Sequence, residues 1–319
     1  MRTNPEPEQT PDGPLYEGRH LDRPDDEVVD QGVRFDLRTL VSRRGVLGIV
    51  GLGAGALALA ACTTDGASTT TTTPTATATP MPTPSSSATS TATITLPSAE
   101  IPDETAGPYP GDGSNGPDVL EESGIVRSDI RSSLDGGATA EGVPLTFSIT
   151  VTDMANGDAP YEGVAVYAWH CDAQGGYSMY SSGIEDVSYL RGVQVADANG
   201  TVSFTSIFPA AYSGRWPHIH FEVYPDLAST SDAGNAIATS QMALPEEACN
   251  AVYATSGYDG SSHNMAQTAL DDDNVFGEDG GELQLATISG DTTSGYLASL
   301  VARVDTTTTA SSGAAPGRP

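Results

Sequence analysis

The most constraining feature of this 319-residue chain is a series of short segments in which apolar and polar residues alternate. Residues 145–153 (LTFSITVTD) and 200–207 (GTVSFTSI) follow this period of two and are rich in β-branched side chains. Such a pattern is typical of strands that bury one face. Four further segments read in a similar way, namely residues 164–171, 219–224, 283–288 and 296–304.

The segments between these strands favour tight turns over long crossover helices. Asn156-Gly157 and Asn199-Gly200 supply turn chemistry between apolar runs, and only residues 246–253 and 264–270 read as helical. Many short strands without alternating long helices indicate strands that pair with their neighbours. We therefore expect an all-β fold, an antiparallel β-sandwich with few short helices.

Residues 1–61 read as an export leader and signal segment. Arg43 and Arg44 resemble the twin-arginine signal, and an uncharged run over residues 45–61 follows them. This run is rich in glycine and alanine and is marginal as a permanent membrane span, which favours a cleavable signal. The long stretch before the arginines is either a processed extension or the result of a start assigned upstream of the real one.

Leu59-Ala60-Ala61 before Cys62 look like a lipobox, in which the cysteine becomes lipid-anchored; the alternative is a cysteine that merely follows a signal segment. Residues 62–98 continue as a linker of Thr, Ser, Pro and Ala, which buries too little apolar surface to fold. We expect a protein exported to the extracellular face of the cell membrane as a lipoprotein, or released from it. Residues 99–306 would form the catalytic domain and residues 307–319 a disordered tail.

The charge of the exported part is strongly acidic. From Cys62 onward six arginines face thirty-two acidic residues, and the chain contains no lysine. A negative field of this size repels nucleic acid and anionic lipid, so we expect no nucleic-acid partner and membrane contact only through the lipid anchor. The two cysteines that remain, Cys171 and Cys249, form an even pair in an oxidising compartment; we expect a disulfide, with two buried thiols as the alternative.

The chemistry of the chain is concentrated in residues 212–220, which read YSGRWPHIH. In an extended strand His218 and His220 project from one face while Ile219 points to the other. Two convergent imidazoles are a feature of many metal sites, although the motif alone is weak.

Two longer stretches make the pattern specific. The order GVAVYAWHCDAQGGYSMYS, then YLRGVQVADANGTVSFTSIFPAAYSGRWPHIHFEV, is similar to the catalytic core of the intradiol ring-cleavage dioxygenases, with a match over residues 104–224 that opens with Glu104-Thr105-Ala106-Gly107-Pro108-Tyr109. The resemblance implies an immunoglobulin- or transthyretin-like sandwich, a non-haem Fe(III) cofactor, and cleavage of catechol-type rings with insertion of both atoms of O2 to give muconate-type diacids. It would place the protein in aromatic compound catabolism.

The resemblance also implies roles for individual residues. Tyr177 matches the tyrosinate that stays on iron, Tyr212 the one released when substrate binds, and His218 and His220 the imidazole ligands. Arg215 matches an active-site arginine that would stabilise developing negative charge, with a surface salt bridge as the alternative. Two phenolates suit hard Fe(III) better than zinc or copper, and with a hydroxide they balance its charge.

Three further residues are candidates for substrate binding. Tyr109 could reach the pocket edge or simply pack. Trp216 could line the mouth of the site or cover the start of the histidine strand. Gln241 could donate a hydrogen bond to the site, although it lies farther from the histidines than the family's glutamine.

Other signals are read as structural. His170 is interpreted as a satisfied core histidine, and Asp271-Asp272-Asp273 as a solvated acidic loop in preference to a calcium site. The rival functions are an envelope-displayed β-sandwich binding module and an iron-binding lipoprotein without turnover. We expect a monomer or loose dimer, with a small catechol-like substrate and O2 as partners.

Overall fold

In the computed structural model the described residues are 8–10, 13–16, 19–20 and 95–308. They fall into two units, one within residues 1–86 and one within residues 87–319. In the first, β1 (Glu8–Thr10), β2 (Gly13–Tyr16) and β3 (Arg19–His20) form a small antiparallel sheet. The predicted twin-arginine signal, the signal segment and the lipobox Cys62 lie outside the described residues. No helix in the described part is long and apolar enough to span a membrane.

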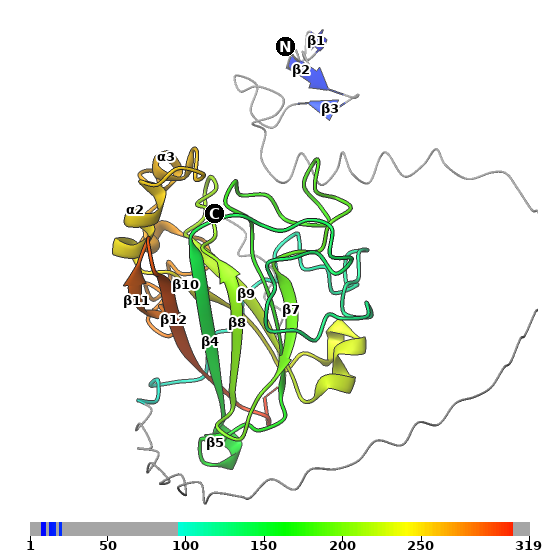
Figure 1. The fold of residues 1–319 in the computed structure, drawn as a ribbon, viewed down its shortest axis with the longest axis vertical. Helices are drawn as coiled ribbons and strands as arrows, with labels where there is room; N and C mark the ends of the chain where they lie inside the picture. The colour runs from blue at the N-terminus through cyan, green and yellow to red at the C-terminus, as the bar shows by residue number, and fades with distance from the viewer. Residues whose placement is uncertain (1–7, 11–12, 17–18, 21–94, 309–319) are drawn as a thin grey trace, which may run out of the picture. The chain divides into compact units, whose positions relative to one another are not determined.

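The second unit is a β-sandwich, which confirms the predicted fold class (Figure 1). One sheet contains β4 (Pro144–Asp153), β5 (Ala159–Pro160), β8 (Thr201–Ile207), β11 (Thr287–Asp291) and β12 (Gly295–Val304). The other has the order β10 (Ala238–Ala243), β9 (His218–Tyr224), β6 (Ala165–Trp169) and β7 (Arg191–Val195). The helical elements in this unit are short: α2 (Glu246–Tyr253), α3 (Ser261–Met265), η2 (Met154–Asn156), η3 (Leu227–Ser231), η4 (Ala233–Asn235) and η5 (Leu270–Asp272).

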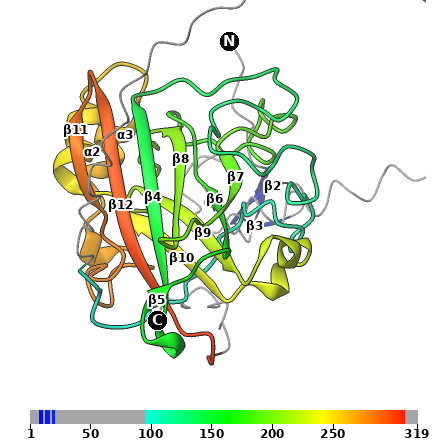
Figure 2. The same cartoon turned by 60° about the horizontal axis from the view of Figure 1, so that its bottom comes forward.

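The sheet that contains β4 is mixed, which corrects the purely antiparallel expectation. β12 pairs with β4 in parallel from Tyr296 opposite Leu145 to Val304 opposite Asp153, while β8 and β11 pair antiparallel to their neighbours. Figure 2 shows β11, β12 and β4 side by side. A parallel pair needs a long connection. Here the connection runs from the end of β4 at Asp153 to the start of β12 at Gly295 and includes the other strands of the sandwich.

The alternating pattern of β4 follows from its position in the sandwich. Leu145, Phe147, Ile149 and Val151 are buried, while the residues between them are partly exposed. Phe147 stacks on Phe204 of β8 at a centroid distance of 5.0 Å. These side chains form the core between the two sheets, and the burial of aromatic and branched apolar groups is the main force that holds the sheets together.

The turn before β8 depends on its glycine. Gly200 has φ of 72°, and a Cβ atom there would collide with the carbonyl oxygen of Val151. Only glycine combines left-handed backbone with so close an approach. The Asn199-Gly200 turn predicted from the sequence is therefore required by the packing of the neighbouring strand.

The four-stranded sheet is covered on both faces. All seven residues of β9 are buried, so its two faces both pack against protein. Ile219, Phe221 and Val223 share one face by the period of two, and His218 and His220 share the other. This second face is the one that carries the site.

Not every predicted element has the expected bounds. The strand expected at residues 283–288 begins only at Thr287; Leu285 makes a single isolated bridge to Ala243 before it. The helix expected at residues 264–270 is α3, which begins and ends earlier, at Ser261 and Met265. β7 and β10 were not anticipated, because neither shows a clear alternation of apolar and polar residues.

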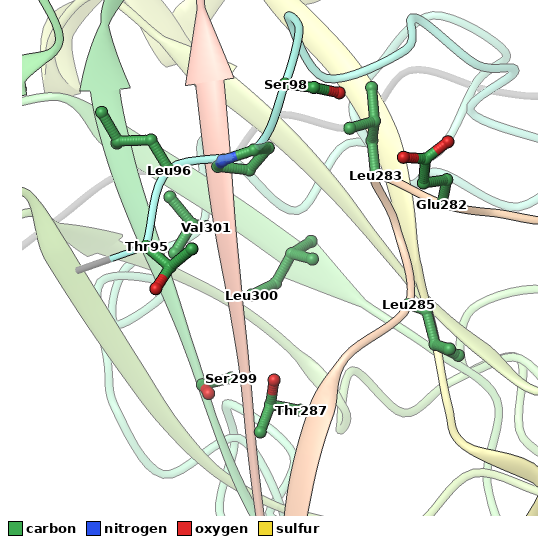
Figure 3. Close-up of a pocket in the computed structure, with 11 residues that line it drawn as sticks. Thr95, Leu96, Ser98, Glu282, Leu283, Leu285, Thr287, Ser299, Leu300 and Val301 are labelled. Carbon is green, nitrogen blue, oxygen red and sulfur yellow. The ribbon is translucent and has the colours of Figure 1, made fainter.

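The described part of the second unit begins at Thr95, four residues before the predicted domain boundary at residue 99. Residues Thr95 to Ser98 run along β12 and border a surface groove of about 350 Å³ with Leu283, Leu285 and Leu300 (Figure 3). Arg303 donates a hydrogen bond to the carbonyl oxygen of Pro97 over 2.9 Å. None of the candidate site residues lines this groove.

The predicted disulfide is wrong. Cys171 and Cys249 are both free, buried thiols. Each thiol donates to a different backbone carbonyl oxygen: Cys171 Sγ to that of Ala210 over 3.6 Å, and Cys249 Sγ to that of Leu244 over 3.7 Å. Burial raises the pKa of both thiols, so they behave as small apolar core residues that are poorly reactive.

Candidate metal and catalytic site

Four predicted side chains converge on the outer face of the four-stranded sheet. The hydroxyl oxygens of Tyr177 and Tyr212 are 3.3 Å apart, and Tyr212 Oη lies 3.2 Å from His218 Nε2. His218 Nε2 lies 3.0 Å from His220 Nε2. Two phenol oxygens and two imidazole nitrogens therefore point at one small region.

Local structure fixes the two histidines. They occupy alternate positions on β9, and Nδ1–H of His218 donates to the carbonyl oxygen of Trp216, which leaves Nε2 with its lone pair facing the cluster. The ring of His220 stacks on Trp169 with a centroid distance of 4.9 Å and an interplanar angle of 6°. Both rings are thus held with Nε2 directed at the phenols.

The two tyrosines come from loops that lie over the sheet. Tyr177 is buried and follows the turn Gly175-Gly176, while Tyr212 is partly exposed and precedes the turn at Gly214. The backbone N–H of Tyr177 donates to Ser181 Oγ over 2.8 Å. Tyr177 is therefore the more firmly held of the two phenols.

The protonation states of these residues suit ligands that wait for a cation. Burial and the charge of Arg215 lower the pKa of His218 to about 3, and burial together with His218 lowers the pKa of His220 well below its ordinary value, so both rings are neutral. Burial raises the pKa of Tyr177 far above its usual range and the pKa of Tyr212 to about 12. The phenols would ionise only if a nearby positive charge displaced their protons.

The arrangement of the four atoms fits a single metal ion. With ligand bonds of about 2 Å, two ligands of one ion at tetrahedral or right angles lie ~2.8–3.3 Å apart, and the separations here are 3.0, 3.2 and 3.3 Å. Among residues 95–308 and the short described stretches before them, no group of three or more His, Cys, Asp or Glu could hold a metal. The phenols are thus indispensable to this donor set, which favours a hard trivalent ion such as Fe(III).

Arg215 lies beside the cluster in a network of its own. Its Nε–H donates to Asp273 Oδ2 over 2.9 Å, and its Nη2 donates to Gln241 Oε1 over 2.6 Å. Gln241 in turn donates through Nε2 to the carbonyl oxygen of Thr105 over 2.9 Å. Gln241 is on β10, directly opposite His220, so the structure brings this candidate residue to the site.

The remaining candidates lie close by but differ in what they do. The ring centroid of Tyr109 lies 5.0 Å from that of Tyr177, so Tyr109 packs beside one of the four candidate ligands. Trp216 is buried, and its indole N–H donates to the carbonyl oxygen of Leu244 over 2.9 Å. This favours the covering role for Trp216 over a place at the mouth of the site.

Asp273 corrects the view of residues 271–273 as a wholly solvated loop. Its side chain is fully buried and accepts hydrogen bonds from Arg215 and from the backbone N–H groups of Trp216, Val275 and Phe276. Burial opposes ionisation, but Arg215 holds the pKa of Asp273 below its usual value. No sequence motif announced this role, because the partner lies 58 residues away.

Comparison with known proteins agrees with this site. Residues 115–226, which include both tyrosines, both histidines and Arg215, match a family model described as Dioxygenase. Over these residues the chain is similar to the dioxygenase family. This match supports an oxidoreductase of the dioxygenase class, as the sequence predicted.

The fold is similar to that of a solved intradiol ring-cleavage dioxygenase. The intradiol ring-cleavage dioxygenase of Tetranychus urticae is 24% identical, with a TM-score of 0.53, and the match covers 66% of this chain and 97% of that one. The dioxygenase domain of a carbohydrate-binding fusion protein from Streptomyces sp. SirexAA-E is 22% identical, covers 65% and 99%, and has a TM-score of 0.41. No curated protein matches the sequence.

Glu104 is a residue near the site that was not singled out. Its backbone N–H donates to Thr239 of β10 over 2.6 Å, and its carboxyl group feels the charges of Arg215, Asp279 and Glu278. Burial raises the pKa of Glu104 to about 7, although Arg215 opposes this shift. A carboxyl group whose pKa burial brings near neutrality, beside an arginine of the candidate site, is a feature of functional sites.

His170 is structural, in line with the interpretation of the sequence. Nδ1 pairs with the carbonyl oxygen of Cys171 over 2.8 Å and Nε2 with Ser206 Oγ over 2.7 Å. Burial lowers the pKa of His170 to about 4, so it is a neutral core residue.

Proposed function

We propose that this chain is a non-haem Fe(III) dioxygenase that cleaves catechol-type rings between the two hydroxylated carbons. The observation that carries the proposal is the convergence of Tyr177, Tyr212, His218 and His220, with separations of 3.0 to 3.3 Å between adjacent donor atoms. The match of residues 115–226 to the dioxygenase family model supports the same chemistry. In the overall reaction a catechol and O2 combine to give a muconate-type diacid, because the ring C–C bond breaks and each new carboxyl group receives one atom of O2.

The metal would be held by the two phenolates and the two imidazoles. When bound, a ferric ion supplies a Lewis-acid centre that takes up the catechol as its dianion and makes the ring reactive toward O2. The neutral imidazoles add no charge, while the two phenolates supply two negative charges that offset most of the charge of a ferric ion. This matters because an unbalanced charge in a buried site would be destabilising.

The unequal burial of the phenols supports different roles for them. Tyr177 is 3% exposed and is held through its backbone to Ser181, whereas Tyr212 is partly exposed. We assign Tyr177 as the permanent ligand and Tyr212 as the one that leaves. A released Tyr212 phenolate can accept a proton from the catechol, because its pKa of about 12 makes it a strong base.

Arg215 is suited to stabilise negative charge on the reacting ring. Asp273 and Gln241 occupy Nε and Nη2, and Nη1 makes no hydrogen bond to any described residue. The two N–H groups of Nη1 are therefore the ones that can donate to a substrate oxygen. The two partners fix the plane of the guanidinium, which is the kind of preorganised donor that catalysis requires.

The charges around Arg215 favour substrates without a carboxylate. The positive charge of Arg215 is already balanced by Asp273, and Glu104, Glu278 and Asp279 add negative charge nearby. An anionic group on the ring would meet repulsion and no unpaired cation. We therefore propose uncharged or cationic catechols as the substrate class.

The test is oxygen consumption by the iron-loaded full chain with a panel of catechols. We expect a red-brown protein, an anaerobic colour change on addition of catechol, and incorporation of both atoms of ¹⁸O₂ into the ring-opened diacid. Tyr177→Phe should abolish the colour or weaken it strongly. Tyr161→Phe, a partly exposed tyrosine next to β5, is the control and should match the wild type.

Two other functions would give different results. An iron-binding lipoprotein without turnover would be coloured but would consume no O2. A binding module of the cell envelope would be colourless and inactive. Either result would overturn the proposal.

We also propose export and lipid anchoring through Cys62, with contact to the membrane through the lipid only and a monomer or loose dimer as the working form. The sequence of the leader supports this. Metabolic labelling with a fatty acid should mark the wild type and not Cys62→Ser, and light scattering should give the mass of one or two chains.

A further inference from the structure

Arg191 on β7 is a second arginine near the site and is almost completely buried, with 1% of its surface exposed. Its Nε donates to Ser178 Oγ over 3.0 Å, and Nη1 donates to the carbonyl oxygen of Pro110 over 2.6 Å and to Tyr167 Oη over 3.0 Å. Nη2 donates to the carbonyl oxygens of Tyr109 and Ser178, both over 2.9 Å. All five N–H groups of the guanidinium are therefore used.

The charge of Arg191 has no carboxylate partner. Within residues 95–308 no Asp or Glu oxygen lies at ion-pair distance from it, and only neutral oxygens surround it. Burying a charge without a counter-ion destabilises the folded state. The presence of Arg191 at this position therefore indicates a role beyond stability. Packing alone could be served by an apolar residue of similar volume.

Four of the five bonds join two segments that lie over the site. Ser178 follows Tyr177 directly in the chain, and Tyr109 and Pro110 belong to the stretch 107–111. The ring of Tyr109 lies 5.0 Å from that of Tyr177, and Gly107 is so close to His220 that a Cβ there would lie 3.3 Å from His220 Cε1. Arg191 thus ties the loop of one ligand to the segment that touches another.

A row across the sheet reinforces this connection. Arg191 pairs with Trp169 on β6, and Trp169 pairs with His220 on β9. Trp169 also stacks on the ring of His220. The position of Arg191 is therefore fixed by the same strands that fix the histidine.

We propose that Arg191 is a positioning residue that sets the Tyr177 phenol relative to His220 for metal binding. The inference rests on the proposed function, since it concerns the same metal. Lysine keeps the charge at this position but concentrates its donors on one atom, so it cannot span Ser178 and the carbonyl oxygens of Tyr109 and Pro110 together. Loss of that span would let the Tyr177 loop move against the histidine strand.

The experiment compares Arg191→Lys with Arg303→Lys in the iron-loaded full chain. Arg303, like Arg191, donates to a backbone carbonyl, but its partners are Pro97 and the carboxylate of Asp158, neither of which is a site residue. We expect Arg191→Lys to bind iron ten- to a hundredfold more weakly in chelator competition, on the order seen for residues that orient metal ligands, and to shift the tyrosinate-to-iron absorption band. Arg303→Lys should keep both properties.

A milder pair of variants guards against misfolding. Ser178→Ala removes one contact of Arg191, and Ser133→Ala removes a buried serine hydroxyl that bonds to Ser188 instead. Ser178→Ala should shift the band in the same direction by a smaller amount, and Ser133→Ala should not. A coloured, active wild type with an unchanged band and iron affinity in both Arg191→Lys and Ser178→Ala would overturn this inference alone. A wild type that shows no band and no turnover would overturn the proposed function and this inference with it.

Discussion

The guanidinium of Arg215 is fixed by the carboxylate of Asp273, with Nε 2.9 Å from Oδ2 and Nη2 3.3 Å from Oδ1. The same carboxylate accepts a hydrogen bond from the backbone N–H of Trp216 over 2.7 Å. Trp216 follows Arg215 in the segment that leads into β9. One buried acid therefore orients both the arginine and the backbone that leads into the histidine strand. The Arg215–Asp273 pair is an internal support of the site, which answers the alternative of a surface salt bridge for Arg215.

Asp273→Asn should impair both folding and turnover. Asparagine has one oxygen acceptor and no charge, so Arg215 would be left buried and unpaired, a change that typically costs about 3–5 kcal/mol. We expect the free energy of unfolding to fall by this order and kcat to fall at least tenfold, measured by denaturant titration and oxygen uptake. Asp272→Asn, an exposed neighbour, should stay within about 0.5 kcal/mol of the wild type. Equal losses in the two variants would contradict the assigned role.

Gly107→Ala should damage the metal site more than its backbone strain explains. Gly107 has φ of 74° and its added Cβ would press on His220, whereas Gly136 has φ of 73° and open space around it. Both substitutions incur a similar backbone cost, about 1 kcal/mol. Iron affinity and kcat should therefore drop in Gly107→Ala and stay near the wild-type values in Gly136→Ala. The contact with His220 is unimportant if the two variants behave alike.

The preference against carboxylated catechols should depend on pH. Burial raises the pKa of Glu104 to about 7, so Glu104 is largely neutral below that pH and charged above it. We expect the ratio of kcat/KM for catechol over that for a catechol carboxylate to rise as the pH passes 7. Glu104→Gln should flatten the change and improve the carboxylated substrate roughly tenfold at pH 8, as expected for removal of one nearby charge. Glu162→Gln, on an exposed turn, should leave the profile unaltered, and a flat wild-type profile would refute the idea.

Glu222 should make the stability of the folded domain fall as the pH rises from about 4.5 to about 8. Burial, with the neighbouring charge of Asp112, raises the pKa of Glu222 to about 8 from an ordinary value near 4.5. Between these two values the unfolded chain has lost its proton and the folded one has kept it, so stability falls as the pH rises through this window. Tyr224 donates to Glu222 over 2.7 Å, and an amide oxygen can accept the same bond. Glu222→Gln should lose less stability than the wild type between pH 5 and pH 9 in thermal melts; an identical loss would argue against the assignment.

The free thiols can be counted directly. Because Cys171 and Cys249 are buried, an alkylating reagent should modify neither in the native chain and both after unfolding without a reductant. Peptide mass mapping locates the labels and separates them from Cys62. If both residues become labelled only after reduction, the chain contains the disulfide that the structure lacks.

The sequence predicted most of the sandwich because strands with one polar face show their period directly. β4 and β8 were found in this way, with bounds that differ by one residue from those observed. β10 (ATSQMA) was missed because it is buried on both faces and has little β-branched character. Residues 283–286 were mistaken for strand because their apolar and polar residues alternate, but burial in this loop does not follow the alternation, since Gln284 is buried and Leu285 is exposed.

The site was predictable where its residues lie in one segment and hidden where they meet through folding. His218 and His220 share a strand, and their spacing alone places them together. Arg191 stands in the stretch YLRG that the resemblance already included, and it is one of six arginines from Cys62 onward, but neither fact indicated its role. Glu104 stands in the segment that opens the resemblance and Asp273 in an acidic run, but neither position indicated a role, because both roles arise from contacts between distant segments.

The last strand of the domain also determines when the domain can form. β12 lies between β11 and β4, and it reaches β4 across some 150 residues of sequence. Loop closure over such a distance is slow, and a nascent chain would emerge with the whole edge of β4 unpaired. Assembly of the sandwich must therefore wait until β12 has been synthesised, and truncation before Gly295 should leave a chain that exposes the unpaired edge of β4 and aggregates.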